Sequence, residues 1–74
     1  MVVQDVVRVG SRVVIRFGEL EESWEIVAPH EADALKGLIS EMSPLGRALL
    51  GHQSGETVLV RAQQPYRVTI ATVG

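Results

Sequence analysis

The side chains best suited to binding a metal ion or moving a proton are the two histidines. His30 is followed directly by Glu31, which could assist it, and His52 stands further along the chain. Metal sites in proteins combine several ligands at recognisable spacings, and neither histidine belongs to such a pattern. We therefore expect His30 and His52 to be ordinary surface residues and predict no metal site.

A second candidate for chemistry is a cluster of carboxylates, Glu19, Glu21 and Glu22. Clustered carboxylates can bind magnesium or calcium. The cluster follows Gly18 and separates two segments of alternating apolar residues, which is typical of a solvated hairpin turn, and we favour that interpretation.

Nucleophilic catalysis and nucleotide binding have no support in the sequence. The serines and threonines form no recognisable triad motif, and the glycines are scattered singly instead of forming a phosphate-binding loop. We predict that the chain is not an enzyme, has no catalytic residues and needs no cofactor.

The composition is that of a small soluble globular domain: 74 residues, 46% hydrophobic, 22% charged, with a formal net charge of -2 and no cysteine. Mild acidity argues against binding a phosphate backbone, which requires clustered lysine and arginine. Neither a membrane-spanning run nor a signal peptide is recognisable. We expect a cytoplasmic protein that contacts other proteins, and neither nucleic acid nor a membrane.

Alternating apolar residues predict four strands. The first hairpin combines Val13, Ile15 and Phe17 with Trp24, Ile26 and Ala28, so we expect Trp24 to pack in the core although tryptophan is also common at interfaces. Val58 and Val60 mark a third strand, and Tyr66, Val68 and Ile70 mark the last. Residues 31–39 predict one helical turn or an ordered loop, and residues 2–9 an edge strand or connector.

A short helix is predicted over Pro44–Leu50. Ser43 is a good N-cap, Pro44 suits the first helical position, and Gly51 lies where a helix would end. The element order is then β-β-loop-α-β-β. Antiparallel strands with one helix packed on a face make an α+β fold.

The run SWEIVAPHEADALKGLISEMSPLGRALLG, which ends at Gly51, resembles the C-terminal domain of the GreA/GreB transcription elongation factors. WEIVAPHEAD is similar to the family's strand and acidic-alanine turn, LIS to its short strand, and SPLGRALLG to its Ser-Pro helix. HQSGETVLV and PYRVTIATV are similar to the strands that follow. The resemblance covers the chain from about Val9 onward.

This resemblance implies an FKBP-like antiparallel sheet in residues 9–74, with residues 1–8 as the connector or edge strand. It also implies binding to bacterial RNA polymerase at the rim of the secondary channel, on a coiled coil of the largest catalytic subunit. The implied contact surface surrounds the Ser-Pro turn: Met42, Ser43, Pro44, Leu45 and Arg47. Arg47 could equally be a solvated surface charge.

Two departures from the family pattern are visible. Some members carry an acidic residue or asparagine where this chain has Met42, which can instead pack adaptably against a partner. The family's N-terminal coiled coil, which stimulates transcript cleavage, has no counterpart in these 74 residues, because no heptad pattern precedes Val9. Two alternatives stay open: the coiled coil belongs to a longer natural chain, or it was never there.

Two other functions stay open. The FKBP-like fold suggests a peptidyl-prolyl isomerase, although Phe17, Trp24 and Tyr66 are few to line its aromatic pocket. The chain could also be a general interaction or oligomerisation domain that pairs through an exposed edge at residues 2–9.

Overall fold

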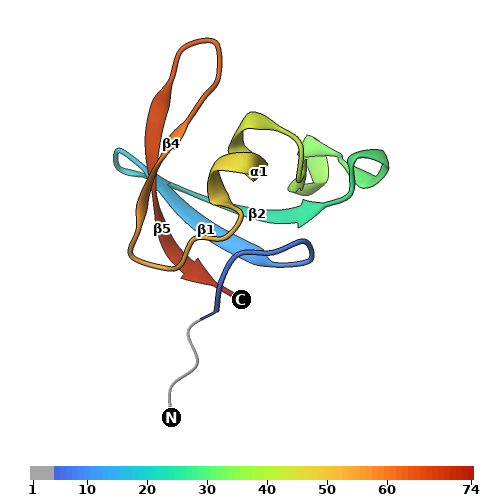
Figure 1. Ribbon diagram of the computed structural model, residues 1–74, viewed down its shortest axis with the longest axis horizontal. Coiled ribbons are helices and arrows are strands. Elements are labelled where there is room, and N and C mark those ends of the chain that lie inside the picture. Colours follow the sequence, from blue (N-terminus) through green and yellow to red (C-terminus); the bar gives the residue numbers. More distant parts are fainter. Residues whose placement is uncertain (1–4) are drawn as a thin grey trace.

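The computed structural model describes residues 5–74, in which a curled five-stranded sheet surrounds one short α-helix (Figure 1). This arrangement confirms the predicted α+β class. The elements in chain order are β1 (Arg12–Phe17), β2 (Leu20–Val27), the 3-10 turns η1 (Pro29–Glu31) and η2 (Ala34–Lys36), β3 (Leu38–Ser40), α1 (Pro44–Leu49), β4 (Thr57–Val60) and β5 (Tyr66–Val73).

The strand order is β3-β2-β1-β5-β4, so strands distant in sequence lie side by side. β1 pairs antiparallel with β2 and with β5, and β4 pairs antiparallel with β5. The sheet is mixed, however, because β3 runs parallel to β2, with Glu25 opposite Leu38 and Val27 opposite Ser40. The chain returns through η1 and η2 before entering β3, and this crossover allows parallel pairing where a tight hairpin would not.

Residues 31–39 therefore contain more structure than the predicted single helical turn or loop: the last residue of η1, all of η2 and the first two residues of β3. Asp33 caps η2 by accepting a hydrogen bond from the Leu35 N–H at 3.1 Å. Gly37 follows with a φ of 75°, a left-handed conformation that favours glycine. The resemblance located β3 correctly at LIS.

The predicted β1–β2 hairpin is confirmed, but its turn is shorter than the glutamate cluster suggested. β2 begins at Leu20, which leaves Gly18 and Glu19 in the turn and places Glu21 and Glu22 in the strand. Both strand glutamates are exposed, and Glu21 accepts a 2.9 Å hydrogen bond from the Arg16 guanidinium. Residues 5–74 hold no group of three or more metal-ligating side chains.

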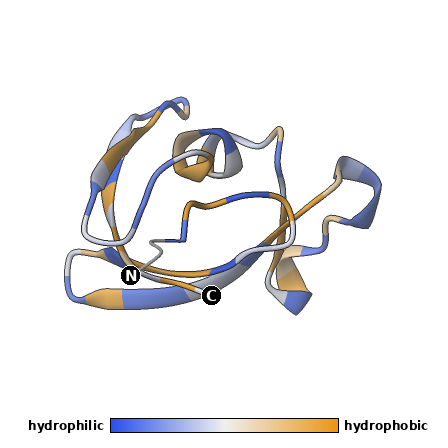
Figure 2. Cartoon of the chain, turned by 60° about the horizontal axis from the view of Figure 1, so that its bottom comes forward, coloured by the Kyte–Doolittle hydropathy of each residue, from blue (hydrophilic) through white to orange (hydrophobic). Residues whose placement is uncertain are grey.

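The core lies between the concave face of the sheet and α1, and hydrophobic and hydrophilic residues alternate along the strands that enclose it (Figure 2). Its buried residues are Val7, Val13, Ile15, Ile26, Leu49, Val58, Val60, Val68 and Ile70. Trp24 packs half-buried against this cluster, as predicted. Phe17 is 47% exposed because it ends β1 beside the turn, where its ring meets Tyr66 edge to face.

The segment predicted as a connector or edge strand contributes to the core. Val7 is only 2% exposed, and its N–H donates to the His52 carbonyl at 2.9 Å. Val6 forms an isolated antiparallel bridge with Gln53. Residues 1–4 of this segment lie outside the described residues.

Helix α1 confirms the predicted start at Pro44 and ends at Leu49, one residue before the predicted end. Leu49 is fully buried, while Leu45 and Ala48 pack half-buried against the core. Gly46 is buried too, and it faces the backbone of Ser40 and Glu41. A Cβ at this position would overlap the Ser40 carbonyl, so glycine lets the helix approach the end of β3 closely.

We predict that Gly46→Ala destabilises the domain by about 1–3 kcal/mol through overpacking. This loss would outweigh the better helix propensity of alanine, which is worth about 1 kcal/mol. Urea unfolding followed by tryptophan fluorescence would measure it. The control is Arg47→Ala, an exposed change in the same helix, which we expect to alter the unfolding free energy by less than about 0.5 kcal/mol; a Gly46→Ala variant as stable as this control would contradict the packing argument.

Candidate functional site

The turn between β3 and α1, residues 40–44, is held by a compact set of hydrogen bonds. The Ser43 hydroxyl donates to the Ser40 carbonyl at 2.7 Å and accepts from the Gly46 N–H at 3.0 Å. The Ser40 hydroxyl accepts from the Met42 N–H at 3.0 Å. With these polar groups satisfied internally, the turn has a fixed shape.

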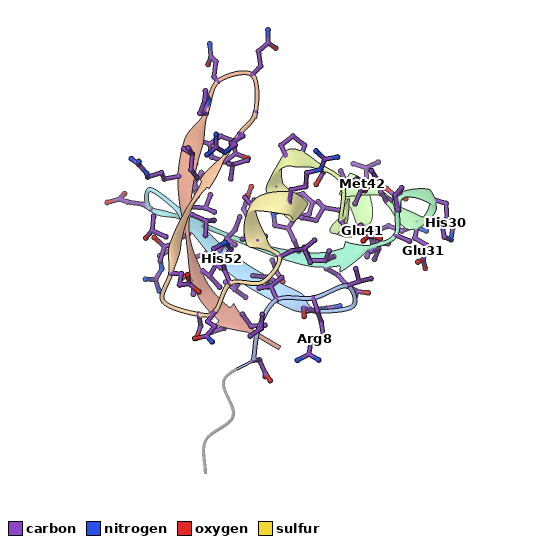
Figure 3. The ribbon with its side chains drawn as sticks, viewed as in Figure 1. Arg8, His30, Glu31, Glu41, Met42 and His52 are labelled. Carbon is purple, nitrogen blue, oxygen red and sulfur yellow. The ribbon has the colours of Figure 1, made fainter. Side chains whose placement is uncertain are left out.

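Two exposed apolar side chains project from this turn. Met42 is 59% exposed and lies beside the start of α1 (Figure 3), and Pro44 is exposed at the first helical position. Proline fits there because it lacks the N–H that a first-turn residue could not use within the helix. Ser43 confirms its predicted role as N-cap.

A groove of about 540 Å³ opens beside the turn, between α1 and β4. Met42, Pro44 and Arg47 form one wall together with Ala48. The opposite wall is formed by β4 and the residues that flank it: His52, Thr57, Val58, Leu59 and Arg61.

The groove carries a basic character although the whole chain is mildly acidic. Arg47 and Arg61 both line it, and neither forms an ion pair with a carboxylate among the described residues. Arg12 and Arg16, by contrast, pair with Glu25 and Glu21 on the β1–β2 hairpin. The groove thus has two arginines whose charge no carboxylate among the described residues pairs with.

The five residues predicted from the resemblance do not all reach the same surface. Met42, Pro44 and Arg47 meet at the groove. Ser43 caps the helix from the adjoining turn, and Leu45 packs half-buried against the core. Sequence reasoning did not predict the opposite wall of the groove. The sequence signal for it was Leu59, an apolar residue that points outward between the buried Val58 and Val60.

None of the chain's three aromatic side chains appears among the groove's lining residues in the described part of the chain. Phe17 and Tyr66 pair with each other, with ring centroids 5.2 Å apart, and Trp24 packs on the core. The aromatic pocket expected of a prolyl isomerase therefore has no counterpart in this groove.

Comparisons with known proteins agree with this arrangement. The family model described as "Transcription elongation factor, GreA/GreB, C-term" matches residues 2–74. The chain belongs to the GreA/GreB family. Within residues 5–74, no helix of this GreA/GreB domain is long and apolar enough to cross a membrane.

Individual relatives show the same likeness. The transcription elongation factor GreA of Thermomicrobium roseum is 51% identical over 55 residues, covering 74% of this chain and 35% of the relative. GreA of Rhodospirillum rubrum is 39% identical over 75 residues, covering 95% and 48%. The crystal structure of Thermus aquaticus Gfh1 superimposes with a TM-score of 0.83 at 28% identity, covering 95% of this chain and 48% of that one. The chain thus spans less than half the length of these relatives.

The GreA/GreB domain also fixes the connection that leads from α1 to the second groove wall. Nδ1 of His52 lies 2.9 Å from Oε1 of Glu56, and the Gln53 N–H donates to Oε2 of the same carboxylate at 2.6 Å. The hydrogen bond with the His52 ring, followed by that from Gln53, lowers the pKa of Glu56 below its ordinary value. Glu56 therefore closes residues 52–56 into a small loop.

We predict that Ser43→Ala lowers the unfolding free energy by about 1 kcal/mol, since the variant loses the N-cap. Urea denaturation would measure the change. The matched control is Ser54→Ala in the exposed loop after Gln53, whose side chain makes no hydrogen bond within residues 5–74 and should change stability little. Equal effects of the two substitutions would show that the cap is energetically unimportant.

The Glu56 loop should make stability depend on acid pH. A carboxyl whose folded pKa is lowered stabilises the fold above its unfolded pKa, ordinarily about 4.3, and loses that contribution as the pH falls through the folded value. We predict that Glu56→Gln lowers the melting temperature at pH 6 and that the difference from the original chain shrinks steadily below pH about 4.3.

Melting curves of both proteins across this range would measure the difference. Glu19→Gln, at an exposed turn residue without a side-chain hydrogen bond among the described residues, is the control and should show no such trend. A constant difference between Glu56→Gln and the original chain at all pH values would contradict the ionic role of Glu56.

Proposed function

We propose that this domain is an RNA polymerase-binding module that docks through the Met42–Pro44 turn and the adjoining Arg47. The observation that carries the proposal is an exposed apolar pair, Met42 and Pro44, on a turn already fixed by its own hydrogen bonds. Binding through a preordered surface loses little conformational entropy. Membership of a transcription elongation factor family makes the transcribing polymerase the fitting partner.

The resemblance suggests where on the polymerase the domain binds: at the rim of the secondary channel, on the coiled coil of the largest catalytic subunit. Met42 replaces the acidic residue or asparagine of some family members. In this chain the contact beside Pro44 would therefore be apolar, with charge supplied by Arg47. The partner surface should then offer an apolar depression with a carboxylate near Arg47.

The proposed activity is binding and not catalysis. In the family as the resemblance describes it, transcript cleavage depends on the acidic tip of a coiled coil, and none of the elements in residues 5–74 is a coiled coil. Residues 5–74 would therefore anchor without stimulating cleavage. Because transcription in bacteria takes place in the cytoplasm, we place the protein there.

The chain offers a closely matched pair of substitutions to test this docking site. Pro44 and Pro29 are both exposed prolines at the start of a helical turn, α1 and η1 respectively. We predict that Pro44→Glu weakens binding to bacterial core RNA polymerase at least about tenfold, since it places a carboxylate at an apolar contact and next to Arg47, where it would compete with the partner's carboxylate. Pro29→Glu should leave the affinity unchanged.

Fluorescence anisotropy of the labelled domain titrated with core polymerase, with a full-length Gre factor as competitor, would measure both affinities. Circular dichroism would show that the two variants remain folded. Saturable binding that Pro44→Glu does not weaken would remove the docking site from this turn, and no binding by the unmodified chain would remove the function.

A further inference from the structure

The free edge of β4 forms one wall of the groove. β4 is the last strand in the order β3-β2-β1-β5-β4, so within residues 5–74 only its β5 side is paired. Thr57, Leu59 and the following Arg61 lie along the groove, opposite Pro44 and Arg47 of α1. An unpaired strand edge presents backbone donors and acceptors that another extended segment can pair with.

The hydrogen-bond register shows which backbone groups face the groove. Ile70 of β5 is a bonded position, since its N–H donates to the Glu56 carbonyl at 2.8 Å and its carbonyl accepts from Gly55 at 2.7 Å. Bonded and non-bonded positions alternate along an antiparallel ladder. Val68 and Tyr66, opposite Val58 and Val60, are therefore bonded, while Thr57 and Leu59 turn their N–H and C=O groups away from β5.

The side chains indicate what kind of segment would fit. Met42, Pro44 and Leu59, the last 38% exposed, provide apolar surface along the groove. Arg47 and Arg61 provide positive charge that no carboxylate of residues 5–74 neutralises, and the groove's lining includes no Asp or Glu in that range. Charge complementarity selects an acidic occupant with some apolar side chains.

We propose that the α1–β4 groove binds an extended acidic peptide segment of a partner protein, which adds as a strand to the free edge of β4. Thr57 and Leu59 would supply the backbone hydrogen bonds, and Arg47 and Arg61 would pair with carboxylates of the segment. The inference extends the proposed docking function, because Met42, Pro44 and Arg47 belong to both surfaces. Its test uses peptides alone, so it can fail or succeed independently of polymerase binding.

The probe is an acetylated and amidated octapeptide of alternating glutamate and valine, titrated into the ¹⁵N-labelled chain. We expect saturable NMR shifts at Thr57, Leu59 and Arg61, together with slower hydrogen exchange of the Thr57 and Leu59 amides. A peptide with lysine in place of glutamate should not bind. A glutamate peptide N-methylated at alternate residues should also lose binding, because it lacks the donors needed for strand pairing.

The matched protein variants are Arg61→Glu and Arg8→Glu. Both arginines are exposed and without an ion pair in the described chain, and Arg8 lies well away from the groove, at the lower edge of the domain (Figure 3). We expect Arg61→Glu to weaken peptide binding at least about tenfold and Arg8→Glu by less than about twofold.

Several outcomes would overturn the proposal. Equal weakening by the two variants would mean diffuse charge attraction, and unchanged binding of the N-methylated peptide would exclude strand addition. Concentration-dependent shifts of the Thr57 and Leu59 amides without peptide would assign the edge to a second copy of the chain. Absence of any shift would leave the groove without this ligand, whatever the polymerase titration shows.

Discussion

The close contact between α1 and the end of β3 is the constraint on which the surface features depend. A helix of six residues has no stability of its own in water, so packing must hold it in place. Leu49 supplies the buried anchor, worth about 1.5–3 kcal/mol for a fully buried leucine side chain. Gly46 removes the Cβ that would hold the helix away from Ser40. The Ser-Pro turn then has one position relative to the sheet.

Hydrogen bonds of polar side chains also hold α1 in place. Ser43 joins the carbonyl of Ser40 to the N–H of Gly46, so one hydroxyl connects the end of β3 to the first turn of α1. Glu56 connects His52 and Gln53 in a similar way at the far end of the helix. Side-chain hydrogen bonds thereby fix both ends of the α1 region. The shape of the groove between α1 and β4 depends on these two fixed ends. Specific recognition of a partner requires a binding surface whose side chains are held in fixed positions.

The sequence predicts the local elements well because their causes are local. Alternation locates the β1–β2 hairpin and the strands around Val58 and Val68, and Ser43 with Pro44 locates the start of α1. Parallel pairing of β3 depends on a crossover whose path only the folded chain reveals. The same holds for the groove, since Arg47 and Arg61 come to line one groove through the packing of α1 against β4 and not through their spacing in the chain. Leu59 stands between Val58 and Val60 in the sequence, but that pattern does not reveal that its strand lies at the edge of the sheet.

The pairing of β1 with β5 has a consequence for how the domain folds. Val13 lies opposite Val73, so the ladder between β1 and β5 joins segments that are 60 residues apart in the sequence. Closing so long a loop costs entropy before any contact is gained, and folds rich in such distant contacts reach the native state slowly. The β1–β2 hairpin can form early because its strands are adjacent in the sequence. β5 pairs with β1 only after these distant segments of the chain have come together. Until β5 docks, β1 has an unpaired edge beside apolar residues, and an exposed edge of this kind is prone to pair with other chains.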